Sequence, residues 1–245
     1  MYNTVHNEVR QAVAHMTDTS PKQKKKRVRG AQRTTRDHWM QSALDTLISE
    51  GVESVKVSVL ADKLGCARSS FYWFFRDRAD LLDALLDHWQ STNTRAIVGQ
   101  AALAASSINM ALINVFSCWT DRGTFDTRLD FAVRDWARRD GSVRRAVDLS
   151  DEARLQALGA MFARFGYDSA ESAIRARIIY FTQIGYDALD TRDSATERAR
   201  TGPHYLFCLT GQKPTTEEIA KVVGLAGFDT SILNPPPSGF VQDRT

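Results

Sequence analysis

The chain has 245 residues, which is enough for one large domain or two smaller ones with a sizeable core. Its composition, 43% hydrophobic and 25% charged, is that of an ordinary globular protein. The formal net charge is only +3, so the distribution of the charge is more informative than its total. Three widely spaced cysteines without a C-x-x-C pair argue against a disulfide framework or a zinc site and indicate a reduced, cytosolic protein.

The N-terminal segment, residues 1–30, is polar and contains no secretory signal. We expect it to form a disordered basic arm. Residues 22–36 include eight basic side chains and no acidic one. Such a run is either a solvated tail or an arm that becomes ordered on the phosphate backbone of DNA, and both interpretations stay open.

A helix-turn-helix is predicted next, after a first helix over about 34–50 that ends before Gly51. Residues 57–75 read VSVLADKLGCARSSFYWFF, a pattern of two short helices joined by a tight turn. Ala61 is small enough for the two helices to cross closely, and Gly65 tolerates the positive φ that the turn needs. A motif of this kind lays its second helix in the major groove, so the sequence predicts a DNA-binding protein.

The rest of the chain predicts helices and no strand, which makes the fold class all-α. Asp77 caps a long helix that runs to about 104. Further helices are predicted over about 107–120, 127–139, 142–165, 169–190, 195–210 and 215–224. The uncharged stretch between Arg95 and Asp121 is long enough to span a bilayer. It contains polar residues and a Ser-Ser-Ile-Asn break, so we expect two buried helical segments and no contact with a membrane.

Three short motifs carry a resemblance to a known family: residues 60–65 (LADKLG), residues 70–75 (SFYWFF), and residues 76–78 (RDR) before Leu81 and Leu82. Over about residues 33–82 the chain resembles the TetR family of bacterial transcriptional regulators. The resemblance implies a DNA-binding domain at 31–82 and an all-helical ligand-binding and dimerisation domain at 83–225. The proline-rich end of the chain cannot be helical, so we expect a tail at 226–245. This sequence departs from the family pattern at Lys56, where a Thr that caps the helix is common, and at Phe74, where His or Tyr is common.

Candidate DNA-binding residues cluster at helix starts. Arg68, Ser69 and Ser70 begin the second helix of the motif, where side chains reach base edges; Arg68 reads a guanine or grips a phosphate. The resemblance implies a phosphate contact for Tyr72, whereas Trp73 either covers the sugar surface or packs internally. Further phosphate contacts are expected from a set that shares helix-start positions and polar or basic chemistry: Thr35, Arg36, Lys56, Ser58, Arg76 and Arg78.

The C-terminal half suggests a dimer interface and an effector pocket. Segment 169–190 is apolar on more than one face, so it either joins a dimer interface with 195–210, as the resemblance implies, or is buried within one chain. The interface candidates are Ile174, Ile178, Phe181, Gly185 and Leu189. The resemblance also implies a small-molecule pocket, although aromatics at helical spacing can equally be core. The pocket candidates are Phe116, Trp119, Trp136, Phe162, Phe165, Tyr180, Gln183 and Tyr186.

We therefore predict a cytoplasmic, sequence-specific regulator that binds a palindromic double-stranded operator as a homodimer. As a repressor, it would be released by a small apolar or aromatic ligand; operator position could also make it an activator. The alternative is a ligand-independent TetR-like protein that organises DNA or binds a partner protein. An open cavity would favour sensing, and a pocket closed by large side chains would favour the alternative.

We expect no enzyme activity, catalytic residue, cofactor or metal, since the sequence has no Gly-rich phosphate loop, nucleophile motif or metal-ligand spacing.

Overall fold

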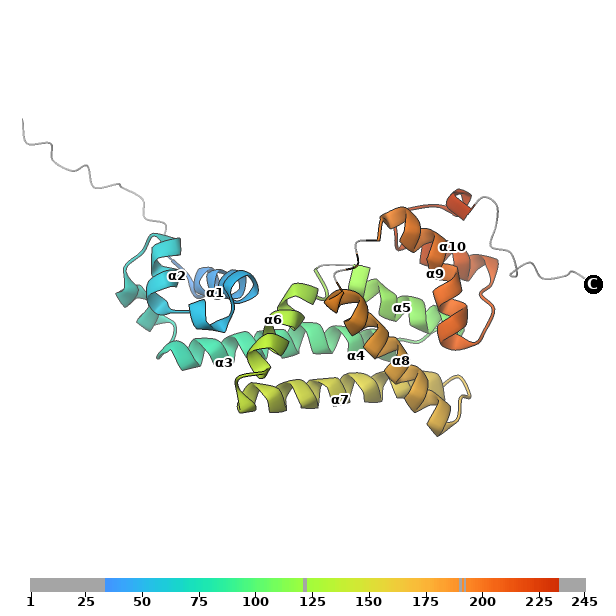
Figure 1. Cartoon of the computed structure of the whole chain (residues 1–245), viewed down its shortest axis with the longest axis horizontal. Coiled ribbons are helices and arrows are strands. Elements are labelled where there is room, and N and C mark those ends of the chain that lie inside the picture. Colours follow the sequence, from blue (N-terminus) through green and yellow to red (C-terminus); the bar gives the residue numbers. More distant parts are fainter. Residues whose placement is uncertain (1–33, 121–122, 190, 192, 234–245) are drawn as a thin grey trace, which may run out of the picture. The chain divides into compact units, whose positions relative to one another are not determined.

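The computed structural model describes residues 34–120, 123–189, 191 and 193–233. The expected basic arm and most of the expected tail lie outside the described residues. Throughout the described part of the chain, every regular element is a helix of the α, 3-10 or π type (Figure 1). The predicted all-α fold class is therefore confirmed.

The N-terminal bundle consists of α1 (Arg36–Glu50), α2 (Val57–Leu64) and α3 (Arg78–Trp89), with short 3-10 helices at Val52–Ser54 and Arg68–Trp73. Ala61 is 1% exposed at the helix crossing, and Gly65 ends α2 with φ of 61°, the left-handed conformation that the turn needs. The second helix of the motif is shorter and tighter than the α-helix we expected. The Ser70 amide bonds to the Ala67 carbonyl three residues back, which is the 3-10 pattern.

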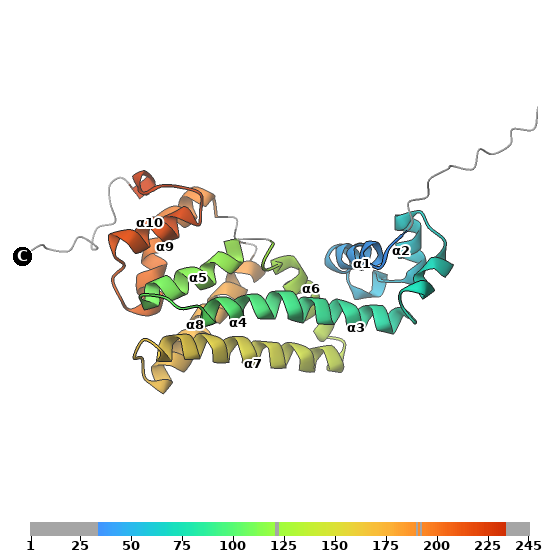
Figure 2. The same cartoon turned by 180° about the vertical axis from the view of Figure 1, so that it is seen from behind.

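A long helix leaves this bundle. Asp77 caps α3 by accepting from the Asp80 amide, and the helix continues through a π turn (Gln90–Thr94) into α4 (Arg95–Ala102). The three segments follow one line in both views (Figures 1 and 2). The chain then breaks before α5 (Ile108–Thr120), within the stretch where the sequence predicted a break. No helix in the described ranges is long and apolar enough to cross a membrane.

The remaining helices agree with the predicted series and begin at polar capping residues. They are α6 (Thr127–Ala137), α7 (Gly141–Ala163), α8 (Ser169–Ala188), α9 (Ala195–Thr210) and α10 (Thr216–Gly224). Helix α7 packs along α8, whereas α9 and α10 pack on each other and on α5. A 3-10 helix at Thr230–Leu233 lies where we expected a loose tail, because Leu233 is buried in the core.

The buried apolar side chains form two clusters. One belongs to helices α4, α5 and α7–α10. The other fills the N-terminal bundle but also takes Leu129, Val133 and Trp136 from α6, and Val143 and Val147 from α7. The bundle therefore completes its core with helices from the C-terminal half, and the domain boundary that we expected at residue 82 falls inside α3.

Candidate functional site

The 3-10 helix Arg68–Trp73 separates its aromatic side chains into two groups. Phe71 is fully buried and packs edge-on against Trp39, with ring centroids 5.2 Å apart, and it stacks on Phe75 at 5.3 Å. Tyr72, whose ring packs edge-on against Phe71 with centroids 5.3 Å apart, and Trp73 are 61% and 78% exposed. Two large adjacent aromatics left in water indicate a surface that meets a partner.

The polar residues at the start of the same helix differ in whether their side chains are free to bond to DNA. Arg68 and Ser69 are exposed, and within the described residues neither side chain has a hydrogen-bond or ion-pair partner. Ser70 is half-buried, and its hydroxyl donates to the Ala67 carbonyl at 2.7 Å. The structure thus leaves Arg68 and Ser69 available to bases, whereas Ser70 is engaged within the turn, contrary to our expectation.

The three arginines predicted as phosphate contacts have different surroundings. The Arg36 guanidinium lies 5.0 Å from the ring centroid of Phe75 and remains on the surface. Arg76 pairs with Asp80 at 3.3 Å but is 83% exposed, so this pair can be exchanged for a phosphate at little cost.

Arg78 does not fit the prediction. Its guanidinium donates to the Val55 carbonyl at 2.6 Å and to the Val52 carbonyl at 2.7 Å. These bonds hold the connection that precedes α2, so Arg78 acts within the fold, and its position in the sequence could not reveal these partners.

The starts of α1 and α2 also differ. The Thr35 hydroxyl accepts from the His38 amide at 3.3 Å and so caps α1. Helix α2 starts at Lys56 without any side-chain cap, and Ser58 does not take over that role. The first amides of α2, beside the exposed Lys56, therefore remain available to an anion.

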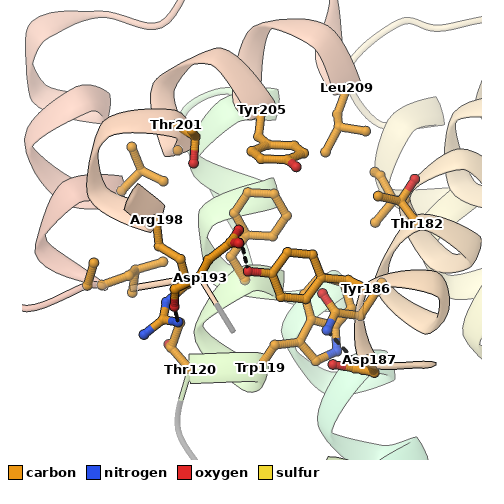
Figure 3. Close-up of a pocket in the computed structure, with 17 residues that line it drawn as sticks. Trp119, Thr120, Thr182, Tyr186, Asp187, Asp193, Arg198, Thr201, Tyr205 and Leu209 are labelled. Carbon is orange, nitrogen blue, oxygen red and sulfur yellow. Dashed lines mark hydrogen bonds between the residues drawn. The ribbon is translucent and has the colours of Figure 1, made fainter. Parts of the chain in front are cut away.

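A cavity of about 380 Å³ lies among α5, α8, α9 and α10 (Figure 3). Four of the eight predicted pocket residues line it: Phe116, Trp119, Gln183 and Tyr186. Figure 3 shows Thr201, Tyr205 and Leu209 of α9 on one side, facing Trp119, Tyr186 and Asp187 across the cavity. Such a volume, lined by aromatic and apolar side chains with a few polar groups, suits a small molecule.

The sequence analysis missed Asp187 and Asp193, two acidic residues that line the cavity beside the predicted residues Gln183, Tyr186 and Trp119. The Tyr186 hydroxyl donates to the Asp193 carboxylate at 2.7 Å, and Gln183 Nε2 donates to Asp187 at 3.0 Å. Burial raises the pKa of Asp187. Trp119 Nε1 is buried and lacks a hydrogen-bond partner in the described part of the chain. The only sequence signal was the spacing of Gln183 and Asp187, which puts them on one face of a helix.

The other four predicted pocket residues do not line this cavity. Trp136 belongs to the core of the N-terminal bundle, because α6 turns that face toward α1. Phe162 is fully buried and packs edge-on against Tyr167, and Phe165 packs at the edge of the same core. Tyr180 is 2% exposed and belongs to a buried ionic network. Aromatic spacing alone could not separate pocket from core.

This network centres on Arg154 of α7, which is fully buried. Its guanidinium donates to Asp130 at 3.0 Å and to the Thr94 hydroxyl in the π turn at 3.0 Å. Trp89 Nε1 at the end of α3 donates to the same Asp130 carboxylate at 2.8 Å. Burial alone would raise the pKa of Asp130, but the guanidinium groups of Arg154 and Arg134 outweigh it and lower that pKa.

The network extends to α8 through Tyr180. Its hydroxyl donates to Asp151 at 2.6 Å and accepts from Arg154 at 2.9 Å and from Arg134 at 2.7 Å. Arg134 also forms a two-pronged pair with Asp151, at 3.0 and 2.7 Å. Charged and polar groups thus connect α3 and its π turn with α6, α7 and α8, and the cavity-lining residues Ile179 and Thr182 lie on the same α8.

An exposed apolar face lies along α8. Ile174, Ile178 and Phe181 are 52%, 48% and 56% exposed, and Leu189, just beyond the helix, is 77% exposed. Gly185, half-buried on the same stretch, leaves open space where a Cβ would be. Tyr205 and Phe207 of α9 are also exposed large hydrophobics. The five predicted interface residues are therefore not buried within one chain. No group of three or more His, Cys, Asp or Glu side chains among the described residues could hold a metal ion.

Comparison with known proteins gives one family match. Residues 40–85 match the model of the family described as bacterial regulatory proteins, tetR family. Among solved structures, the chain is similar to AmtR from Mycobacterium smegmatis, at 16% identity and a TM-score of 0.46, over 84% of this chain and 92% of that one. It is also similar to AlkX, a TetR family repressor from Dietzia sp. strain DQ12-45-1b implicated in the biodegradation of n-alkanes. That match has 18% identity and a TM-score of 0.36, over 84% of this chain and 96% of AlkX.

The helix-turn-helix and the family match together define a DNA-binding transcription regulator. Residues 40–85 are therefore a DNA-binding domain of the kind found in bacterial regulatory proteins of the tetR family. The proteins of this family are regulators and not enzymes.

Proposed function

We propose that this regulator is a cytoplasmic repressor that binds a palindromic operator as a homodimer and leaves it when a small molecule enters the cavity. The observation that carries the proposal is the division of the second motif helix, where Phe71 is buried while Arg68, Ser69, Tyr72 and Trp73 face solvent. A surface that reads DNA needs this combination of a guanidinium, hydroxyls and aromatic faces held by a rigid core.

Arg68 is the proposed base-reading residue, because its guanidinium is exposed and can bond two acceptors of one guanine. Arg36, Lys56, Arg76 and Tyr72 are proposed as phosphate contacts around it. Lys56 stands beside the uncapped start of α2, so a phosphate there would meet both a positive side chain and free amide groups.

The exposed apolar face of α8 supports a homodimer. Its members Ile174, Ile178, Phe181 and Leu189 lie on or just beyond one helix and would be poorly placed in water. Burial of this face against its own copy would remove them from solvent in a two-fold interface. A two-fold protein in turn presents two motif helices to two half-sites of a palindrome.

The cavity supports release by a ligand rather than the ligand-independent alternative, because large side chains do not close it. Residues of α8 line the cavity, and Tyr180 of the same helix bonds to the network that reaches Trp89 and Thr94. A ligand that favours one packing of α8 would thereby favour one position of α3.

Footprinting on the DNA beside the protein's own gene, at two salt concentrations, tests this function. We expect a protected palindrome with half-sites about one helical turn apart or slightly more. Arg68→Ala should cost about 1–3 kcal/mol of affinity for that site and relax the preference at one base pair. The matched charge control is Lys221→Ala on the exposed face of α10, which should bind normally. Diffuse, salt-sensitive binding without a footprint would contradict the operator model and favour a DNA-organising role.

A further inference from the structure

We propose that the effector of the cavity is a small organic cation with an aromatic or apolar body, and that the Asp187 carboxylate is its counter-ion. This inference rests on the proposed effector-binding function and names the chemical class of the effector. The sequence favoured an apolar or aromatic ligand over a highly charged one, and a single positive charge is added here to that apolar or aromatic body.

The described lining of the cavity carries more negative than positive charge. Among the described lining residues, the ionisable groups that are charged at neutral pH are the carboxylates of Asp187 and Asp193 and the guanidinium of Arg198. The described part of the lining therefore has a formal charge of minus one. Arg198 is exposed, and its Nη1 donates to the backbone carbonyl of Asp193 at 2.5 Å. This negative charge would repel an anionic ligand, and a cationic ligand would neutralise it.

The two carboxylates of the cavity differ in their hydrogen-bond partners. Asp193 already accepts a hydrogen bond from the Tyr186 hydroxyl at 2.7 Å. Asp187 accepts only the neutral amide of Gln183 at 3.0 Å, and no cation within the described residues pairs with it. A half-buried carboxylate without a cation is costly, and burial raises the pKa of Asp187 accordingly. An ammonium or similar group on a ligand would supply the missing partner.

Aromatic side chains lie next to the Asp187 carboxylate. Trp119 and Tyr186 lie beside Asp187 in the close-up, and Tyr205 faces them from α9 (Figure 3). Aromatic faces attract cations as well as aromatic bodies, so they suit both parts of such a ligand.

The test compares three probes that share one naphthalene body and differ in charge: 1-naphthylmethylamine, the neutral 1-naphthylmethanol and the anionic 1-naphthaleneacetate. Binding to the full-length protein is measured by calorimetry at neutral pH, without DNA. We expect the amine to bind at least about tenfold more tightly than the other two, as a hydrogen bond to a charged group would provide. Asp187→Asn keeps the side-chain shape and should remove this preference. Asp193→Asn removes the same formal charge from the lining, and it should reduce the preference less than Asp187→Asn does, because Asp193 already has a partner in the Tyr186 hydroxyl.

Each outcome supports or overturns the inference. Equal binding of alcohol and amine, or an undiminished preference in Asp187→Asn, would overturn it, and so would failure of all three probes to bind. Circular dichroism of Asp187→Asn verifies that the variant is folded. Release of operator DNA is measured separately for each probe. Release by the alcohol or the acid, without preference for the amine, would refute the cationic class and still support the repressor function.

Discussion

Removal of the Arg154 guanidinium is the sharpest test of the network between the N-terminal bundle and the cavity-lining helix. Arg154 is fully buried and donates to Asp130, Tyr180 and Thr94 at 2.9–3.0 Å. Arg154→Met keeps much of the side-chain volume but leaves the buried Asp130 carboxylate short of a partner. Breaking a buried pair in this way costs about 3–5 kcal/mol. Because Arg134 still pairs with Asp130 at 2.9 Å, we expect about 3 kcal/mol.

Urea unfolding followed by far-UV circular dichroism, at one fixed protein concentration, measures this loss. The control is Arg144→Met on the same helix, whose pair with Asp148 is exposed at 64% and 53% for the two side chains. That variant should change the unfolding free energy by no more than about 0.5 kcal/mol. A loss below about 1 kcal/mol for Arg154→Met would refute the assigned role of the pair.

A double variant tests the physical reason. Adding Asp130→Asn to Arg154→Met removes the uncompensated charge and keeps an acceptor for Trp89 Nε1, which lies 2.8 Å from Asp130. We expect the double variant to be more stable than Arg154→Met alone. If it is less stable, the loss in the single variant has a cause other than a buried unpaired carboxylate.

Four further predictions follow from the remaining surfaces. Trp73→Ala should weaken operator binding by about 1 kcal/mol or more while changing stability by less than about 0.5 kcal/mol, because the side chain is 78% exposed; an equal loss of stability would identify it as core. Phe181→Glu should yield a monomer in sedimentation analysis, and a persistent dimer would refute the proposed face. Asp187→Asn should become more stable relative to the unmodified protein as pH rises from acid to neutral. The folded-state pKa of Asp187 is raised, so its protonated form is favoured and stability is lost as the carboxyl ionises; a difference that shrinks with pH would refute this sign. Deletion of residues 22–29, which removes six basic side chains, should reduce the slope of DNA affinity against salt concentration on a logarithmic scale. An unchanged slope would mean that this segment does not contact the phosphates.

The sequence by itself determined the helices and the helix-turn-helix, since both depend on local interactions. Apolar residues repeat at helical spacing, and a side chain that accepts from an amide three residues later starts a helix regardless of the rest of the chain. Thr215 and Glu218 form the predicted capping box, and Gly65 adopts the predicted left-handed turn. The exposed face of α8 was likewise visible as an apolar stripe that one core could not absorb.

Only the tertiary structure decided which of these residues meet. Whether an aromatic residue lines a cavity or fills a core depends on the helix that packs against it: Trp119 reaches the cavity, whereas Trp136 faces the N-terminal bundle. The sequence predicted a phosphate contact for Arg78, but in the structure its guanidinium donates hydrogen bonds to the backbone carbonyls of Val52 and Val55. The spacing of Gln183 and Asp187 indicated one helix face but not the cavity beside it, and nothing in the sequence indicated that Arg154 and its partners are buried together. Their roles depend on burial and on partners from distant helices, and local spacing does not encode either.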